Sequence, residues 1–254
     1  MYKLYNKSKL GFAILNICLY VFGMSLADEL SFIVKIPKVI TLPIAIAMSV
    51  VLLIFINKHN LREEYGLQKS PYKASSFLFF IPLIVMVSVN FWFGTANIEW
   101  GIDSFLYILS MLAVGFLEEI IFRGFLFKAL IVHGKKLAII VTSVSFGVGH
   151  IVNLFTSSGM DLLSNVCQIL SAIAIGFLFV IMFDRGKSLW PCILTHSLFN
   201  AFSIFTNMQE LNGMVEIVVS AVITFISVIY ALILIKTLPN IQNNSLNLEA
   251  NEQK

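Results

Sequence analysis

Eight apolar runs separated by short polar segments occupy most of this 254-residue chain. A membrane-spanning helix needs about 20 mainly apolar residues. Only 12% of the residues are charged, and the mean hydropathy is +0.90, whereas soluble domains carry about 25% charged residues. We therefore predict an all-α, polytopic membrane protein with about eight transmembrane helices, at residues 10–27, 39–56, 76–93, 104–132, 137–155, 163–183, 189–205 and 215–235.

The Lys and Arg residues predict how these spans are oriented. Of the 17 cations, 14 fall at the termini or in loops on one side of an eight-span protein, the opposite loops hold only Lys35 and Lys38, and Arg123 lies inside a span. Cytoplasmic loops carry an excess of Lys and Arg. We therefore expect a multi-pass protein of the cell membrane with both termini in the cytoplasm. The small net charge of +3 then reflects orientation, and no nucleic-acid partner is expected.

The chain shows no sign of a second domain. We find no internal repeat, no phosphate-binding loop and no cysteine spacing typical of a disulfide framework or a paired-cysteine metal site. A single membrane domain over residues 1–254 is the simplest organisation, and the polar segment 240–254 is predicted to be disordered. The abundance of Ile, Asn, Lys and Phe indicates an AT-rich bacterial source.

Charged residues inside the fourth span stand out against this background. Glu118, Glu119 and Arg123 occur within six residues of an otherwise apolar run. One such group at the centre of a membrane helix costs about 2.5–3.5 kcal/mol even on the lower scales, so a functional site is the default interpretation. Glu119 and Arg123 are four residues apart and can pair on one helix face. Glu118 points about 100° away from Glu119, so it is free to face another partner.

Three further polar groups lie in the next three spans. His150 follows Phe146, Gly147 and Gly149, and the two glycines permit close helix approach. His196 and Asn200 are four residues apart on one face of the seventh span. Counted at about 1.5 Å per residue from the cytoplasmic ends, Glu118 and His150 lie about 20 Å deep and His196 about 10 Å. With helix tilt, one layer in the cytoplasmic half of the membrane can hold them all.

These groups permit two kinds of chemistry. A carboxylate and an imidazole beside one water can deprotonate it, and a second imidazole with a carboxamide can stabilise an oxyanion. Such a set can hydrolyse an amide without a covalent intermediate. Alternatively, Glu118, His150 and His196 form a two-histidine, one-glutamate set that can hold catalytic zinc. The residues leave the cofactor undecided between none and zinc.

The three motifs, from Glu118 to Gly124, from Phe146 to His150 and from His196 to Asn200, resemble those of the CPBP intramembrane protease family. That family groups type II CAAX prenyl proteases with bacteriocin-processing and self-immunity proteins. The resemblance implies a catalytic core over residues 105–205 and a cavity in the cytoplasmic half of the bundle. It also implies that Glu118 and His150 activate water, that His196 and Asn200 stabilise the oxyanion, and that Glu119 and Arg123 orient the site. The residues alone leave open which of the two glutamates is the base.

We therefore predict an intramembrane endopeptidase whose substrate is a membrane-associated protein or a peptide precursor, with bacteriocin or pheromone processing or self-immunity as expected roles. The alternative is a non-catalytic membrane partner with the same fold, acting as an immunity or regulatory protein. A proton-coupled transporter is a further interpretation, although it favours repeat symmetry, which we do not find.

Overall fold

The computed structural model describes residues 1–156, 160–207 and 213–238, so the predicted disordered segment 240–254 lies outside the described residues. Within those ranges the chain forms helices and no named strand, with one isolated bridge between Thr95 and Thr206. The predicted all-α class is therefore confirmed. The elements are α1 (Tyr2–Lys7), α2 (Lys9–Val34), α3 (Thr41–Lys58), η1 (Ala74–Phe80), α4 (Ile81–Ser88), η2 (Val89–Phe91), α5 (Ile102–Glu118), η3 (Glu119–Leu126), α6 (Phe127–Leu130), η4 (Ile131–His133), α7 (Lys135–Gly149), η5 (His150–Leu154), α8 (Leu162–Gly186), α9 (Trp190–Phe202), η6 (Ser203–Phe205) and α10 (Gly213–Thr237).

Seven helical segments in the described ranges are long and apolar enough to cross a membrane. They coincide with all the predicted spans except the seventh, 189–205. That span corresponds to α9, whose 13 residues reach only about 20 Å, less than the roughly 30 Å of a hydrocarbon core. The protein is thus a multi-pass membrane protein of about eight helices, one of which is too short to span the bilayer by itself.

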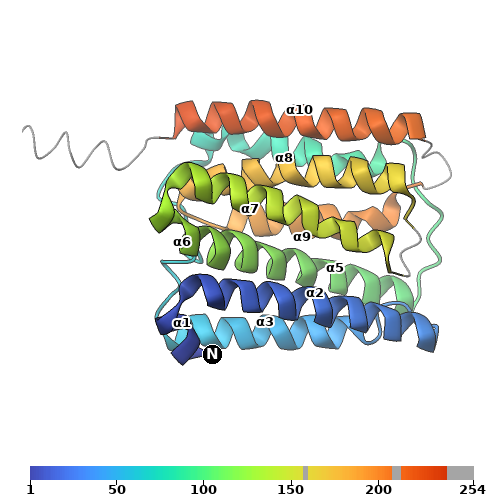
Figure 1. Ribbon diagram of the computed structural model, residues 1–254. Coiled ribbons are helices and arrows are strands. Elements are labelled where there is room, and N and C mark those ends of the chain that lie inside the picture. The colour runs from blue at the N-terminus through green and yellow to red at the C-terminus, as the bar shows by residue number, and fades with distance from the viewer. Residues whose placement is uncertain (157–159, 208–212, 239–254) are drawn as a thin grey trace, which may run out of the picture.

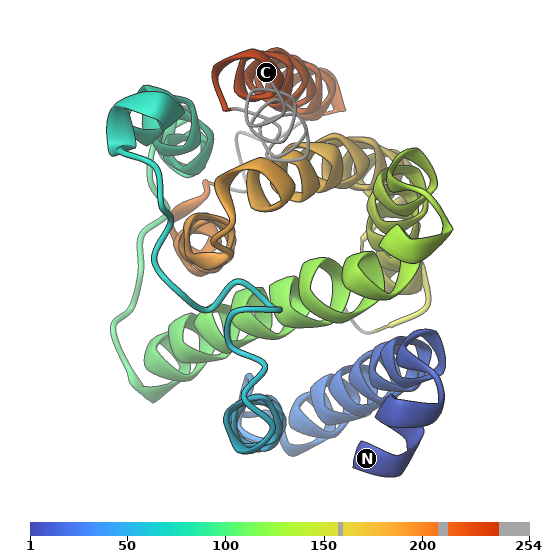
Figure 2. The same ribbon diagram turned by 90° about the vertical axis from the view of Figure 1, so that its left-hand side faces the viewer.

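The long helices lie side by side and their loops gather at the two ends of the bundle (Figure 1). We call the end that holds the N-terminus, loop 59–73 and the end of α10 the terminal end. The distal end holds loops 35–40 and 94–101. Along the bundle axis, α5, α7, α8 and α9 surround the centre, while α2 and α3 pack beside α5 (Figure 2). Helix α4 packs on α9, and α10 packs on α8.

The perimeter of the bundle is apolar. Phe22 on α2 is 76% exposed, and Phe225 on α10 is 67% exposed. Large apolar surfaces of this kind mark contact with a membrane or a partner. Together with the length of the helices, they place this surface against lipid.

Two glycines allow the central helices to approach closely. A Cβ on Gly115 of α5 would lie 2.6 Å from backbone atoms of Ser197 on α9. A Cβ on Gly147 of α7 would lie 2.8 Å from the backbone nitrogen of Ile173 on α8. The helix contact predicted at Gly147 is thus confirmed, but the one predicted at Gly149 is wrong. A Cβ on Gly149 meets nothing within 4 Å, because this residue lines a cavity.

We expect Gly115→Ala to destabilise the protein, because the added methyl group must push α5 away from the backbone of α9. Overpacking of this kind typically costs about 1–3 kcal/mol. The thermal unfolding midpoint of the purified protein in detergent measures the loss. The matched control is Gly149→Ala, which adds the same methyl group in open space. Equal midpoints for the two variants would show that the α5–α9 contact tolerates the extra carbon.

Candidate active site

A buried ion pair lies where α5 continues into η3, a π-helical segment. The Nη1 atom of Arg123 lies 2.9 Å from Oε1 of Glu119, and both side chains are fully buried. The pairing predicted from their four-residue spacing is therefore confirmed. The guanidinium also lies over the ring of Phe146, 3.9 Å from its centroid, a geometry that favours a cation. Single π-turns inside α-helices occur frequently at functional sites.

His196 connects the two glutamates. Its Nδ1 lies 2.7 Å from Oε1 of Glu119, and its Nε2 lies 3.2 Å from Oε2 of Glu118. The contact with Glu119 is a hydrogen bond, whereas the one with Glu118 is a close approach of a ring nitrogen to a carboxylate oxygen. Arg123, Glu119, His196 and Glu118 therefore form a chain of contacting polar groups that ends at Glu118.

Glu118 faces a cavity of about 1020 Å³. Its side chain is 13% exposed, whereas that of Glu119 is fully buried. His150 and Asn200 line the same cavity. The structure thus brings three of the four predicted catalytic residues to one space, while His196 lies behind Glu118 and does not line the cavity. The expected division of the two acids, one neutralised by Arg123 and one facing elsewhere, is also present.

The ring of His150 is oriented by its neighbours. Its Nδ1 lies 3.1 Å from the backbone oxygen of Phe146, an acceptor, so Nδ1 carries the hydrogen. In the neutral ring Nε2 is then the acceptor and is available as a base. Nδ2 of Asn165, a buried residue of α8, donates to the backbone oxygen of His150 at 2.8 Å. These two bonds fix His150 where α7 passes into η5.

Asn200 lies near the end of α9, one turn after His196. Its backbone oxygen accepts a hydrogen bond from Oγ of Ser203 at 2.6 Å. The same Oγ lies 2.7 Å from the hydroxyl of Tyr107 on α5. These contacts fix the end of α9 against α5, and Asn200, Ser203 and Tyr107 all line the cavity. The carboxamide of Asn200 supplies a neutral hydrogen-bond donor in the same cavity as Glu118.

The expected zinc ligands do not fit a metal ion in this arrangement. Among the residues that the structure describes, no three His, Cys, Asp or Glu side chains gather closely enough to hold one. His196 bonds Glu119 through Nδ1, and it does not line the cavity that His150 lines. Glu118, His150 and His196 therefore do not form a common ligand set here.

The cavity opens at the distal end of the bundle. Asp28, Lys35 and Lys38 line it there, and among the described residues none of the terminal-end loops contributes to its lining. The sequence prediction placed the cavity in the cytoplasmic half together with the termini; its mouth lies at the end opposite the N-terminus (Figure 1), and which of the two ends is cytoplasmic stays a prediction. The ring of Phe125 packs against those of Phe12 and Tyr65 in the terminal half, where all three are buried. They close the side on which the cavity was expected.

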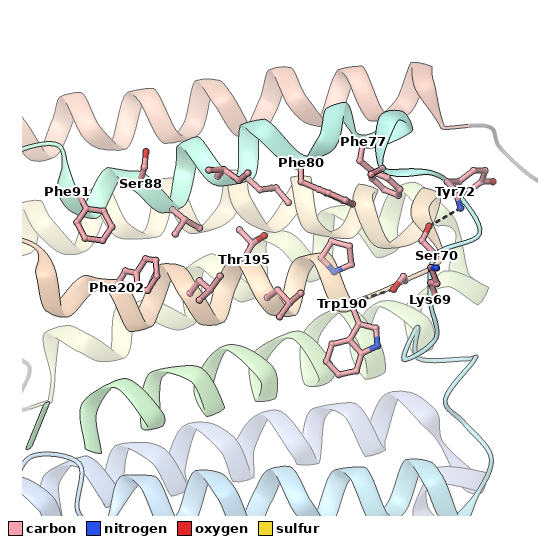
Figure 3. A pocket seen from close by; sticks show the side chains of 18 residues that line it. Lys69, Ser70, Tyr72, Phe77, Phe80, Ser88, Phe91, Trp190, Thr195 and Phe202 are labelled. Atoms are coloured by element: carbon pink, nitrogen blue, oxygen red, sulfur yellow. Dashed lines mark hydrogen bonds between the residues drawn. The ribbon is translucent and has the colours of Figure 1, made fainter. Parts of the chain in front are cut away.

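A second hollow, a groove of about 800 Å³, runs between α9 on one side and η1 and α4 on the other (Figure 3). Its lining is mainly apolar, with Phe77, Phe80, Phe91 and Phe202 along it and Lys69 and Ser70 at the terminal end. Thr195 faces this groove although it precedes His196 in the chain. Helix α9 thus separates the groove from the cavity that holds Asn200.

The fold and site define a multi-pass helical protein with a carboxylate–imidazole cluster inside the membrane. Residues 99–202 match the model of the type II CAAX prenyl endopeptidase family, Rce1-like. The chain is also similar to the protein "Putative membrane peptidase YdiL" of Bacillus subtilis (strain 168), with 28% identity over 110 residues. That match covers 43% of this chain, which spans only 40% of the relative's length. No solved structure matches. The family resemblance predicted from the motifs is therefore confirmed over the segment that contains them.

Sequence reasoning missed two residues that contact the site. The hydroxyl of Tyr20 on α2 donates to Oε1 of Glu118 at 2.6 Å, and Asn165 holds the backbone of His150. Tyr20 lies in an apolar run that precedes the matched segment, where a tyrosine is ordinary. A signal for Asn165 did exist, because a carboxamide inside a predicted span is unusual in the same way as Asn200.

Proposed function

We propose that this protein is an intramembrane endopeptidase in which Glu118 and His150 activate the attacking water. The observation that carries the proposal is the shared cavity: a carboxylate, an imidazole with a free Nε2 and a carboxamide all face one space inside the membrane helices. The match to the type II CAAX prenyl endopeptidase family over the same residues supports it.

The proposed reaction needs no covalent intermediate. A water bound between Glu118 and His150 loses a proton to one of them as its oxygen attacks the peptide carbonyl carbon. The carbonyl oxygen becomes an oxyanion, and the carboxamide of Asn200 donates a hydrogen bond to it. When the C–N bond breaks, the captured proton passes to the leaving amine. The products are a carboxylic acid and an amine, and the site returns to its initial state.

We assign His196 a different role from the one implied by the family resemblance. Its Nδ1 bonds Glu119, its Nε2 lies 3.2 Å from Glu118, and the residue does not line the cavity in which the oxyanion would form. It instead orients Glu118 and links it to the buried Glu119–Arg123 pair. Such a chain fixes the orientation of the catalytic group, as the third member of a catalytic triad does. Asn200 then stabilises the oxyanion without a contribution from His196.

The cavity also constrains the substrate. Its volume of about 1020 Å³ is at the upper end of ordinary ligand sites, about 300–1,000 Å³, and suits several residues of an extended peptide. A folded domain does not fit. We infer that the substrate is a membrane-associated or precursor peptide of a bacterial cell, such as a bacteriocin or pheromone precursor.

We infer the side of the membrane from which substrate enters the cavity from the distribution of Lys and Arg and from the distal position of the cavity mouth. If the Lys- and Arg-rich terminal end is cytoplasmic, the cavity mouth faces the outside. We expect a thiol reagent that does not cross membranes to label Lys35→Cys in intact cells, because Lys35 lies at the distal end. Lys73→Cys, in the terminal-end loop, is the matched position and stays unlabelled until the cells are opened. The reverse labelling would place the mouth in the cytoplasm.

Proteolysis is tested by comparing peptide termini in cells. One strain carries the wild type, and another carries the Glu118→Gln/His150→Gln double variant at the same membrane level. New termini in the membrane or medium that occur only with the wild type support the proposal and reveal the substrate. The control is Glu216→Gln. Glu216 lies on α10 and accepts a hydrogen bond of 2.7 Å from the hydroxyl of Ser164, and neither residue lines the cavity. Identical termini in all strains, with the cellular phenotype kept by the double variant, would favour a non-catalytic immunity partner.

A further inference from the structure

We propose that Tyr20 is a positioning residue for Glu118, so that the reaction site includes a helix outside the family-matched segment. The inference rests on the proposed function of Glu118. Tyr20 lies on α2 (Lys9–Val34), whereas the family match begins at residue 99. Its hydroxyl donates to Oε1 of Glu118 at 2.6 Å, and its side chain is only 8% exposed.

The geometry shows why this contact matters. The terminal torsion of a glutamate side chain is broad and does not fix the plane of the carboxylate. In this structure the two oxygens are held by different helices: Oε2 lies 3.2 Å from Nε2 of His196 on α9, and Oε1 bonds the hydroxyl of Tyr20 on α2. Two anchors fix the plane, whereas one leaves the group free to rotate about the remaining bond.

The contact also has a defined place in the cavity. Tyr20, Met24 and Asp28 follow one another by one helical turn on α2, and all three line the cavity that Glu118 faces. Helix α2 therefore forms a wall of the reaction space opposite the matched helices. Each oxygen of a carboxylate has two acceptor positions, so the bond from Tyr20 still leaves Glu118 able to accept a proton from water.

The hydroxyl of Tyr20 has no comparable alternative role. Two other polar residues of this helix bond the backbone of the helix itself: Asn16 donates to the backbone oxygen of Phe12, and Ser31 donates to that of Ala27. A tyrosine that served only for packing would be replaceable by phenylalanine. Here the replacement removes one hydrogen bond from an ionisable group, a loss worth about ten-fold to a hundred-fold in rate if it appears in the transition state.

The test measures Tyr20→Phe with an internally quenched peptide that copies the cleavage site found in the comparison of termini. We expect kcat to fall about ten-fold to a hundred-fold with KM nearly unchanged. In the Glu118→Gln background the same change has no further effect, because Tyr20 acts through Glu118. The matched control is Tyr230→Phe, which removes an equally buried hydroxyl that bonds the backbone oxygen of Phe77 at 2.7 Å. Its kcat stays at the wild-type level.

The outcomes separate the two proposals. If every cleavage seen with the wild type is also seen with Glu118→Gln, the proposed function has failed. If the wild type cleaves and Glu118→Gln keeps only a small residual turnover, but Tyr20→Phe keeps full kcat or lowers turnover by the same factor in both backgrounds, the role of Tyr20 is overturned. Infrared spectroscopy gives a readout that does not need activity. The carboxyl band that disappears in Glu118→Gln shifts in Tyr20→Phe and stays in place in Tyr230→Phe, and an unmoved band contradicts the contact.

Discussion

Glu118→Gln reduces turnover by about 10²–10⁴-fold, the usual contribution of a general base. Glutamine keeps the shape of the side chain, so it can still bond Tyr20 and contact His196, but it cannot take a proton from water. The hydrogen bond at 2.6 Å to Tyr20 and the 3.2 Å contact with His196 are therefore largely retained, and the fold survives. The measurement is kcat on the quenched peptide, with the thermal midpoint as a check on folding.

A double-mutant cycle makes this prediction sharper. Glu118 and His150 face the same cavity, and groups that act on one water are not additive. We expect the Glu118→Gln/His150→Gln variant to be little worse than the worse of the two single variants. Additive losses would mean that the two residues serve separate steps. Turnover within a few-fold of the wild type for Glu118→Gln would remove Glu118 from the reaction, whatever the result for His150.

The sequence was sufficient for features that depend on neighbouring residues. Apolar length located the spans, and the four-residue spacing of Glu119 and Arg123 located their ion pair. These features follow from the periodicity of one helix and from the absence of water in lipid. The separation of Glu118 from Glu119 follows from the same helical geometry.

Features that depend on packing between helices were not predictable in this way. The counted depths of Glu118 and His196 differ by about 10 Å, yet the two side chains lie 3.2 Å apart. Helix α9 starts inside the bundle, because Ser188 and Leu189 are buried and the N–H of Leu189 donates to the backbone oxygen of Gly66 at 2.8 Å. The distal position of the cavity mouth was not foreseen, because Tyr65, from a polar loop, packs inward against Phe125. Neither the buried start of α9 nor the inward packing of Tyr65 can be predicted from the spacing of residues along one helix.

Arg123→Met is expected to destabilise the protein severely. Removing one partner of a buried ion pair leaves an uncompensated charge and typically costs about 3–5 kcal/mol, a large part of the roughly 5–15 kcal/mol that stabilises a domain. Methionine retains contact with the Phe146 and Phe179 rings that flank the guanidinium, so the loss measures charge rather than a cavity. The thermal midpoint in detergent reports it.

Two further variants identify the cause of that loss. Adding Glu119→Gln to Arg123→Met removes the orphaned charge, so most of the stability returns, although His196 loses a charged partner and activity does not recover. Lys9→Met is the matched control. Lys9 forms an ion pair with Glu64, and the Lys9 side chain is 48% exposed. Exposed ion pairs contribute only about 0–1 kcal/mol to stability. If Arg123→Met lowers the midpoint no more than Lys9→Met does, Glu119 is not held as an anion. The chain of contacts that orients Glu118 would then contain a neutral carboxyl group at Glu119.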